Sequence, residues 1–97
     1  MSVETFCYVL IGNETGRVKI GKSRNVPQRI RTLQTSAPER VRLVAVLMHG
    51  DKVERRLHKR LASHRIVGEW FSPSCHSALG QYLARCETMV AGENIFA

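Results

Sequence analysis

The sequence predicts an α+β fold in which two strands are followed by a helix, a third strand and two further helices. Two observations support it. Residues 6–11 are aromatic and β-branched, residues 17–21 alternate polar and apolar, and both patterns are typical of strands. Apolar residues then recur at helical spacing in three later segments. With 97 residues, 43% of them hydrophobic, the chain is expected to form a single domain, residues 1–97, around one core.

The first two strands are expected to form a hairpin, because a loop of about five residues rich in glycine and asparagine joins them. Opposed residues of antiparallel strands lie on one face of the sheet. If Val9 and Ile20 face the core, Tyr8 and Lys19 share the other face as direct or diagonal neighbours. A slip of one residue would turn the apolar set outward, so this register is favoured.

A helix is predicted after the hairpin. Asn25 with Gln28 three residues later fits a helix N-terminus, and Val26, Ile30 and Leu33 then share one helical face. The mostly apolar residues 41–47 read as a buried third strand.

Gly50 and Asp51 are expected to open the second helix, and Asp51 and Glu54 have the spacing of a capping pattern. Residues 65–71 are expected to be irregular or briefly extended. A third helix over about residues 73–90 follows, with Ser72 as its cap. Its apolar face packs either on the core of the same chain or against a second copy of the chain. The sequence therefore does not decide between a monomer and a dimer.

The basic residues are concentrated in one segment. Residues 17–65 hold fourteen basic and three acidic side chains, a net charge of +11, whereas the rest of the chain is acidic. Such one-sided charge is typical of a nucleic-acid-binding surface, although solvated helix and strand faces would give the same count. No apolar run is long enough to span a membrane, so no membrane partner is expected. The three cysteines are expected to be reduced thiols in the cytoplasm.

Several motifs occur in a fixed order along the chain: Cys7-Tyr8, Lys19-Ile20-Gly21-Lys22-Ser23, the helix start that carries Arg29, the pair Glu54 and His58, and Gly68-Glu69-Trp70-Phe71. In this order and spacing they resemble the GIY-YIG nuclease superfamily, and more specifically a compact phage-type branch with a lysine in the second motif. The resemblance covers roughly residues 6–71.

The resemblance implies a small three-stranded antiparallel sheet flanked by helices, in agreement with the predicted element order. It implies metal-dependent hydrolysis of a DNA phosphodiester by an activated water, without a covalent intermediate and on a single divalent ion, Mg²⁺ or Mn²⁺. Phe6 stands where the superfamily has its first motif glycine, and Lys19 stands where it has a tyrosine. Both departures fit the compact branch.

We expect Tyr8 to be the general base or the group that orients water. Because a free phenol has a pKa of about 10, it is a poor base at neutral pH, and a cationic Lys19 across the strands would favour the phenolate. Lys19 and His58 remain alternatives for the base. A strand tyrosine beside a solvated lysine is the ordinary structural explanation.

Arg29 is the expected phosphate clamp, because its guanidinium fork can contact two oxygens of one phosphate. Glu54 is the expected metal ligand, since Mg²⁺ prefers carboxylate and phosphate oxygens. The competing interpretation makes Glu54 a capping carboxylate. His58 is expected in the site without an assigned role, and Glu69 is a weaker acid candidate.

Four further residues are expected to contact DNA: Gly21, Lys22, Arg24 and Arg31. The glycine would let the backbone approach a phosphate closely, and the cations would make non-specific backbone contacts. A non-catalytic nucleic-acid-binding module of the same fold and a protein-interaction modulator remain alternatives to the nuclease. The substrate form and the sequence preference stay open.

Overall fold

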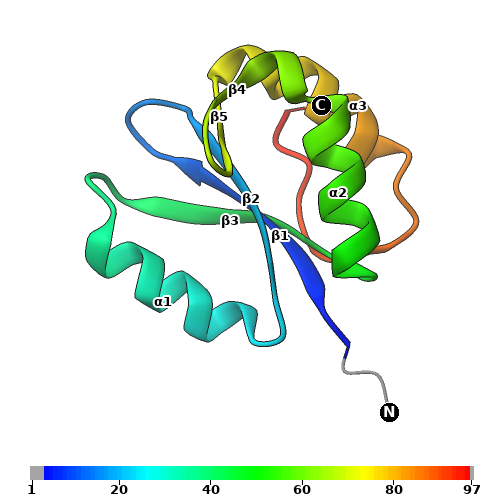
Figure 1. Cartoon of the computed structure of the whole chain (residues 1–97), viewed down its shortest axis with the longest axis horizontal. Helices are drawn as coiled ribbons and strands as arrows, with labels where there is room; N and C mark the ends of the chain where they lie inside the picture. Colours follow the sequence, from blue (N-terminus) through cyan, green and yellow to red (C-terminus); the bar gives the residue numbers. More distant parts are fainter. Residues whose placement is uncertain (1–3, 97) are drawn as a thin grey trace.

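A computed structural model describes residues 4–96 and places a six-stranded, fully antiparallel sheet at the centre of the chain (Figure 1). The strands are β1 Phe6–Gly12, β2 Val18–Ser23, β3 Val41–Leu47, β4 Arg65–Val67, β5 Trp70–Phe71 and β6 Met89–Gly92. The helices are α1 Val26–Ser36, α2 Gly50–Arg60 and α3 His76–Ala84, with short 3₁₀ turns at Ala62–His64 and Pro73–Cys75. The sheet order is β4-β5-β2-β1-β3-β6.

The predicted α+β class is confirmed, but the expectation of a three-stranded sheet is wrong. The three expected strands, β1, β2 and β3, form the middle of the sheet. Strands β4 and β5 come from the segment expected to be irregular, and they are three and two residues long. A strand of that length is too short to show an alternating pattern, which is why the sequence did not reveal them.

The third helix is shorter than predicted. It ends at Ala84, and the chain then turns and adds β6 to the edge of β3. Its buried residues Leu79 and Leu83 pack into the core of the same chain. This part of the apolar face is therefore not available for contact with a second copy. None of the helices within residues 4–96 has the length and apolar character of a membrane span.

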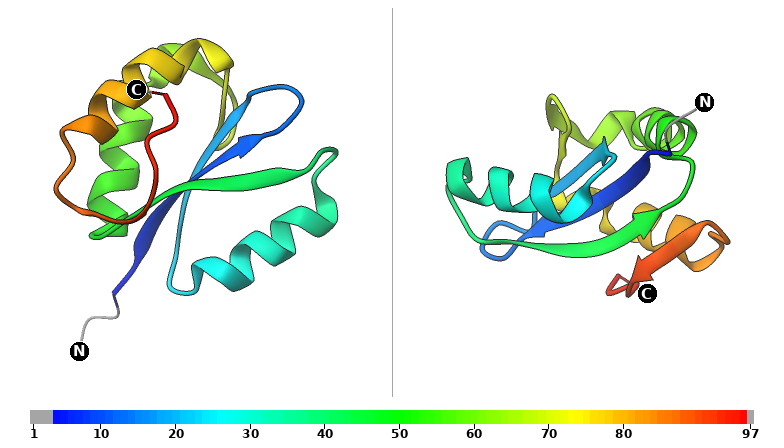
Figure 2. Two further views of the ribbon diagram at one scale, coloured as in Figure 1. Left: turned by 180° about the vertical axis from the view of Figure 1, so that it is seen from behind. Right: turned by 90° about the horizontal axis from the view of Figure 1, so that it is seen from below.

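The β1–β2 register agrees with the prediction. Val9 pairs with Ile20, and both lie in the larger core beneath α2 and α3. Tyr8 faces the opposite side and pairs with Gly21, in a smaller core that α1 covers. The helices therefore sandwich the sheet, with α1 on one face and α2 and α3 on the other (Figures 1 and 2).

Two of the three predicted helix caps are confirmed. The Asn25 side chain accepts a hydrogen bond from the Gln28 amide at 3.2 Å, and the Ser72 side chain accepts one from the Ser74 amide at 3.3 Å. The second helix begins at Gly50, but it follows His49 in the left-handed region and has no side-chain cap. The expected capping role of Asp51 and Glu54 is therefore wrong, and the Glu54 carboxylate is free for another role.

We expect Leu57→Ala to lower the free energy of unfolding by about 2–5 kcal/mol, because the substitution removes a buried anchor of α2 and leaves a cavity. Leu57 is 0% exposed and lies in the larger core. The exposed Val90 provides a control, since Val90→Ala should change stability by less than about 0.5 kcal/mol. Urea denaturation followed by circular dichroism measures both, and equal midpoints would contradict this account of how α2 is held.

Candidate functional site

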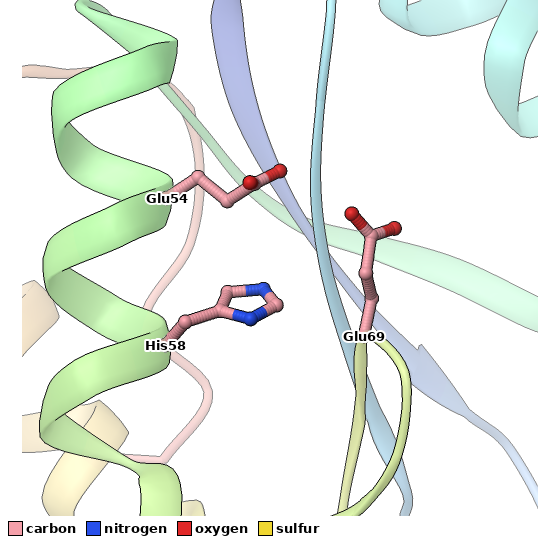
Figure 3. Close-up of side chains that lie close together, drawn as sticks. All are labelled: Glu54, His58 and Glu69. Carbon is pink, nitrogen blue, oxygen red and sulfur yellow. The ribbon is translucent and has the colours of Figure 1, made fainter.

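Two carboxylates and an imidazole lie together between α2 and the start of β5. Potential ligand atoms of Glu54, His58 and Glu69 all lie within 4.8 Å of one another. Glu54 and His58 are four residues apart and project from successive turns of α2 (Figure 3). Glu69 precedes β5, and its carbonyl accepts a hydrogen bond from the Ile20 amide of β2 at 3.0 Å. Backbone pairing therefore carries Glu69 to the two α2 side chains.

His58 ties α2 to β2. Its Nε2 lies 2.8 Å from the Ile20 carbonyl oxygen, and its ring meets Phe71 edge-on at 5.1 Å between centroids. Because a carbonyl oxygen can only accept, the hydrogen bond places the ring proton on Nε2. His58 thus lies in the site as predicted, and its contacts are those of a positioning residue.

Lys19 is paired with a carboxylate rather than with the phenol expected to be its neighbour. Its Nζ lies 3.2 Å from Glu69 Oε1 and 5.5 Å from the centre of the Trp70 ring. The Lys19 side chain is only 12% exposed, so solvent screens this ion pair weakly. The expectation that Lys19 would draw Tyr8 toward the phenolate is not met.

Tyr8 is completely buried, and the absence of a side chain at Gly21 makes room for its phenol. A Cβ at Gly21 would collide with the Tyr8 hydroxyl. This is a different reason for glycine from the close phosphate approach suggested by the sequence. Burial and the charge of Glu69 raise the pKa of Tyr8 to about 12, while Arg29 acts in the opposite direction. Tyr8 is therefore a neutral phenol at physiological pH.

Two buried oxygens in this region lack a partner. Within residues 4–96, Tyr8 Oη and Glu54 Oε2 are the buried side-chain polar atoms that make no hydrogen bond. Burial, and then the nearby charge of Glu69, raise the pKa of Glu54 above its ordinary value. An unpaired buried acceptor beside a second carboxylate is unfavourable unless a cation or a donor is bound there. The carboxylate oxygens of Glu54 and Glu69 fit the ligand preference of Mg²⁺.

Arg29 lies on the solvent side of this region. Together with Lys22 and Arg24 it lines a surface depression of about 370 Å³ at the end of β2. Arg29 also influences the Tyr8 phenol electrostatically, as do Glu54 and Glu69. The arginine and both carboxylates therefore act electrostatically on the phenol, although Tyr8 and Glu54 come from opposite sides of the sheet.

Two of the predicted DNA contacts need qualification. The ammonium of Lys22 is 2.8 Å from Asp51, so it is already paired with an anion. Arg31 is exposed, but it is two residues from Arg29 and therefore about 200° away around α1. The two arginines cannot hold the same phosphate, and the structure does not bring Arg31 into the site.

Glu69 is a member of the cluster to which the sequence analysis gave too little weight. It precedes two aromatic residues, and no helical or strand spacing connects it with the residues of α2. The available signal was its position directly before Trp70, because an aromatic pair packed on the sheet fixes the chain on either side of it.

We expect Glu54→Gln to raise the melting temperature of the metal-free protein at pH 8 by a few degrees. The substitution removes a partly buried charge that lies near Glu69. The pKa of Glu54 is raised in the folded state, so the ionised carboxylate destabilises the fold above its ordinary pKa of 4.5, and this penalty disappears in acid.

The difference between wild type and variant should therefore shrink as the pH falls toward 4. Thermal melts in EDTA at several pH values test this, with Glu87→Gln as the exposed control. A stabilisation that is independent of pH would contradict it.

Comparison with known proteins identifies the family to which this chain belongs. No curated protein and no solved structure matches the chain. The family described as the T5orf172 domain matches residues 5–88, which includes β1, β2, all three helices and every member of the site. The chain therefore belongs to the T5orf172 domain family.

Proposed function

We propose that the chain is a metal-dependent DNA endonuclease of the GIY-YIG type. The observation that carries the proposal is the cluster of Glu54, His58 and Glu69, in which one buried carboxylate oxygen of Glu54 makes no hydrogen bond. The charges of Glu69, Arg29 and Glu54 also act on the phenol of Tyr8. The T5orf172 family is associated with nuclease-type domains of phages, which supports the same reading. A module that only binds DNA gains nothing from carboxylates beside its phosphate site, because they repel the backbone unless a cation lies between them.

Glu54 would hold the divalent ion, with Glu69 as the neighbouring carboxylate. When bound, Mg²⁺ or Mn²⁺ would neutralise charge on the phosphate and on the leaving oxygen. The ion would also remove the repulsion that raises the pKa of Glu54. Lys19 balances the charge of Glu69, so only Glu54 is left without a cationic partner.

Tyr8 orients the attacking water in this proposal. A neutral phenol accepts a hydrogen bond through its oxygen, and the Tyr8 hydroxyl has that capacity free among the described residues. With its pKa near 12, Tyr8 holds its proton at neutral pH, and Glu69 is the nearby charge that affects it most. A phenol that keeps its proton positions the water without taking a proton from it, so the base is a separate group.

Arg29 binds the scissile phosphate, with Lys22 and Arg24 along the adjacent backbone. All three line one depression, so a strand that passes along it would meet successive cations. His58 contacts no substrate in this scheme. It fixes the distance between α2 and β2, and hence the position of Glu54.

The first test is cleavage of plasmid and oligonucleotide DNA in Mg²⁺ or Mn²⁺. We expect nicking that EDTA abolishes and that Glu54→Gln removes. Arg29→Ala should lower the rate by about 10²–10³, as expected when a group that stabilises transition-state charge is lost. Arg31→Ala is the matched control, because it removes the same charge from the other side of α1. It should alter the rate only slightly.

Circular dichroism must show that each variant is folded. If the wild type binds DNA but cuts no form of it with either metal, the chain is a binding module and the nuclease proposal fails.

The second test separates chemistry from stability at Tyr8. Tyr8→Phe removes a buried hydroxyl that has no partner, so the melting temperature should stay the same or rise slightly. The cleavage rate should nevertheless fall by at least about tenfold, since the water loses its orienting group. Tyr82→Phe is the control at a tyrosine outside the site. Full cleavage by Tyr8→Phe would remove Tyr8 from the mechanism.

A further inference from the structure

A cavity of about 220 Å³ lies beside the site, between the end of α1, the β1–β2 hairpin and the β4–β5 hairpin. Its walls are mostly apolar and include Leu10, Leu33, Val41, Ile66, Val67 and Trp70. Arg17 and Lys19 also line it. A mainly apolar cavity with a few charged groups at its edge is the usual form of a ligand site, and this volume suits a single ring system rather than a peptide or a helix.

The β4–β5 hairpin carries two apolar side chains that are exposed to solvent and do not pack in the core. Ile66 is 46% and Val67 is 66% exposed, and Gly68 turns the hairpin with a positive φ of 54°. The hairpin follows the 3₁₀ turn after α2 and forms the edge of the sheet beside β2 (Figure 1). Its two apolar side chains line the open side of the cavity, where they can contact a ligand.

The cavity borders the cluster of Glu54, His58 and Glu69 through Lys19. The same ammonium group lies over Trp70 and pairs with Glu69, so it belongs to both places. The carboxylate of Glu39 also borders the cavity, but it accepts hydrogen bonds from the amides of Glu14 and Thr15 and from the Thr15 hydroxyl. These donors hold its charge in the β1–β2 loop. Lys19 is paired with Glu69, so Arg17 is the one of the two lining cations that is left to meet an anion.

We propose that this cavity receives an unpaired base of the DNA strand whose backbone lies at Arg17, so that the preferred substrate is DNA with an unpaired or extruded nucleotide. The identity of the ligand as DNA rests on the proposed function. The Trp70 ring and the apolar hairpin residues supply an apolar surface of the kind that bases occupy, and Arg17 supplies the adjacent phosphate contact. A paired base is held in its duplex and cannot enter.

The test uses three short duplexes of equal length: fully paired, with one central unpaired adenine, and with an abasic residue in place of that adenine. Binding is measured in EDTA, so the result does not depend on cleavage. Trp70 is the single tryptophan of the chain, so its fluorescence reports on the cavity directly. We expect the unpaired adenine to bind at least about fivefold tighter than the other two duplexes and to quench Trp70 more strongly.

The double variant Ile66→Ser and Val67→Ser removes the apolar hairpin contacts without a change of charge. It should lose the preference for the unpaired adenine while it keeps its affinity for the paired duplex. The double variant Val90→Ser and Ile95→Ser is the matched control, since it alters one exposed valine and one exposed isoleucine that do not line the cavity. It should keep the preference.

Equal affinity and equal quenching for the three duplexes overturn the proposal. So does equally tight binding of the abasic duplex, because that would assign the preference to bent DNA rather than to a base. The wild-type comparison decides the question even if the hairpin variant does not fold. Failure of the nuclease proposal is a separate result, namely an absence of cleavage in Mg²⁺ and Mn²⁺, which these measurements in EDTA do not address.

Discussion

The antiparallel register of β1 and β2 is the constraint on which the rest of the site depends. It sets Tyr8 opposite Gly21, the one place on β2 where the absence of a side chain leaves room for a phenol ring. The same register turns the Ile20 side chain to the other face and leaves its carbonyl at the edge of β2, where it accepts the hydrogen bond from His58. One strand pair therefore positions a group on each side of the sheet. A shift of one residue would bury Lys19 in the core and turn Tyr8 away from Gly21.

Much of this arrangement could be predicted because it depends on local patterns. The alternation of polar and apolar residues predicted which side chains of β1 and β2 face the core, and the Asn25 cap predicted where α1 begins. The short strands could not be predicted, since β5 has two residues and exists because Trp70 and Phe71 pair with β2. The Lys19–Glu69 ion pair depends on that same long-range pairing. Sequence reasoning therefore assigned the Lys19 charge to Tyr8.

The site is built from groups that weaken the fold on their own. A buried hydroxyl without a partner and two neighbouring carboxylates each cost free energy, and the surrounding cores must offset that cost. The larger core packs α2 and α3 under the sheet, and the smaller core packs α1 over Tyr8. Ordinary apolar packing thus keeps unfavourable polar groups in place, as expected where a ligand rather than the protein supplies the missing partner.

The ion pair between Lys22 and Asp51 affects how the basic surface responds to ionic strength. A cation that is already neutralised by a carboxylate displaces fewer condensed counterions from a polyanion than a free one does. Each such internal pair lowers the number of ions exchanged with the solvent below the number of basic side chains at the surface. The affinity of this chain for a polyanion should therefore decline less steeply with salt than the fourteen basic side chains of residues 17–65 suggest.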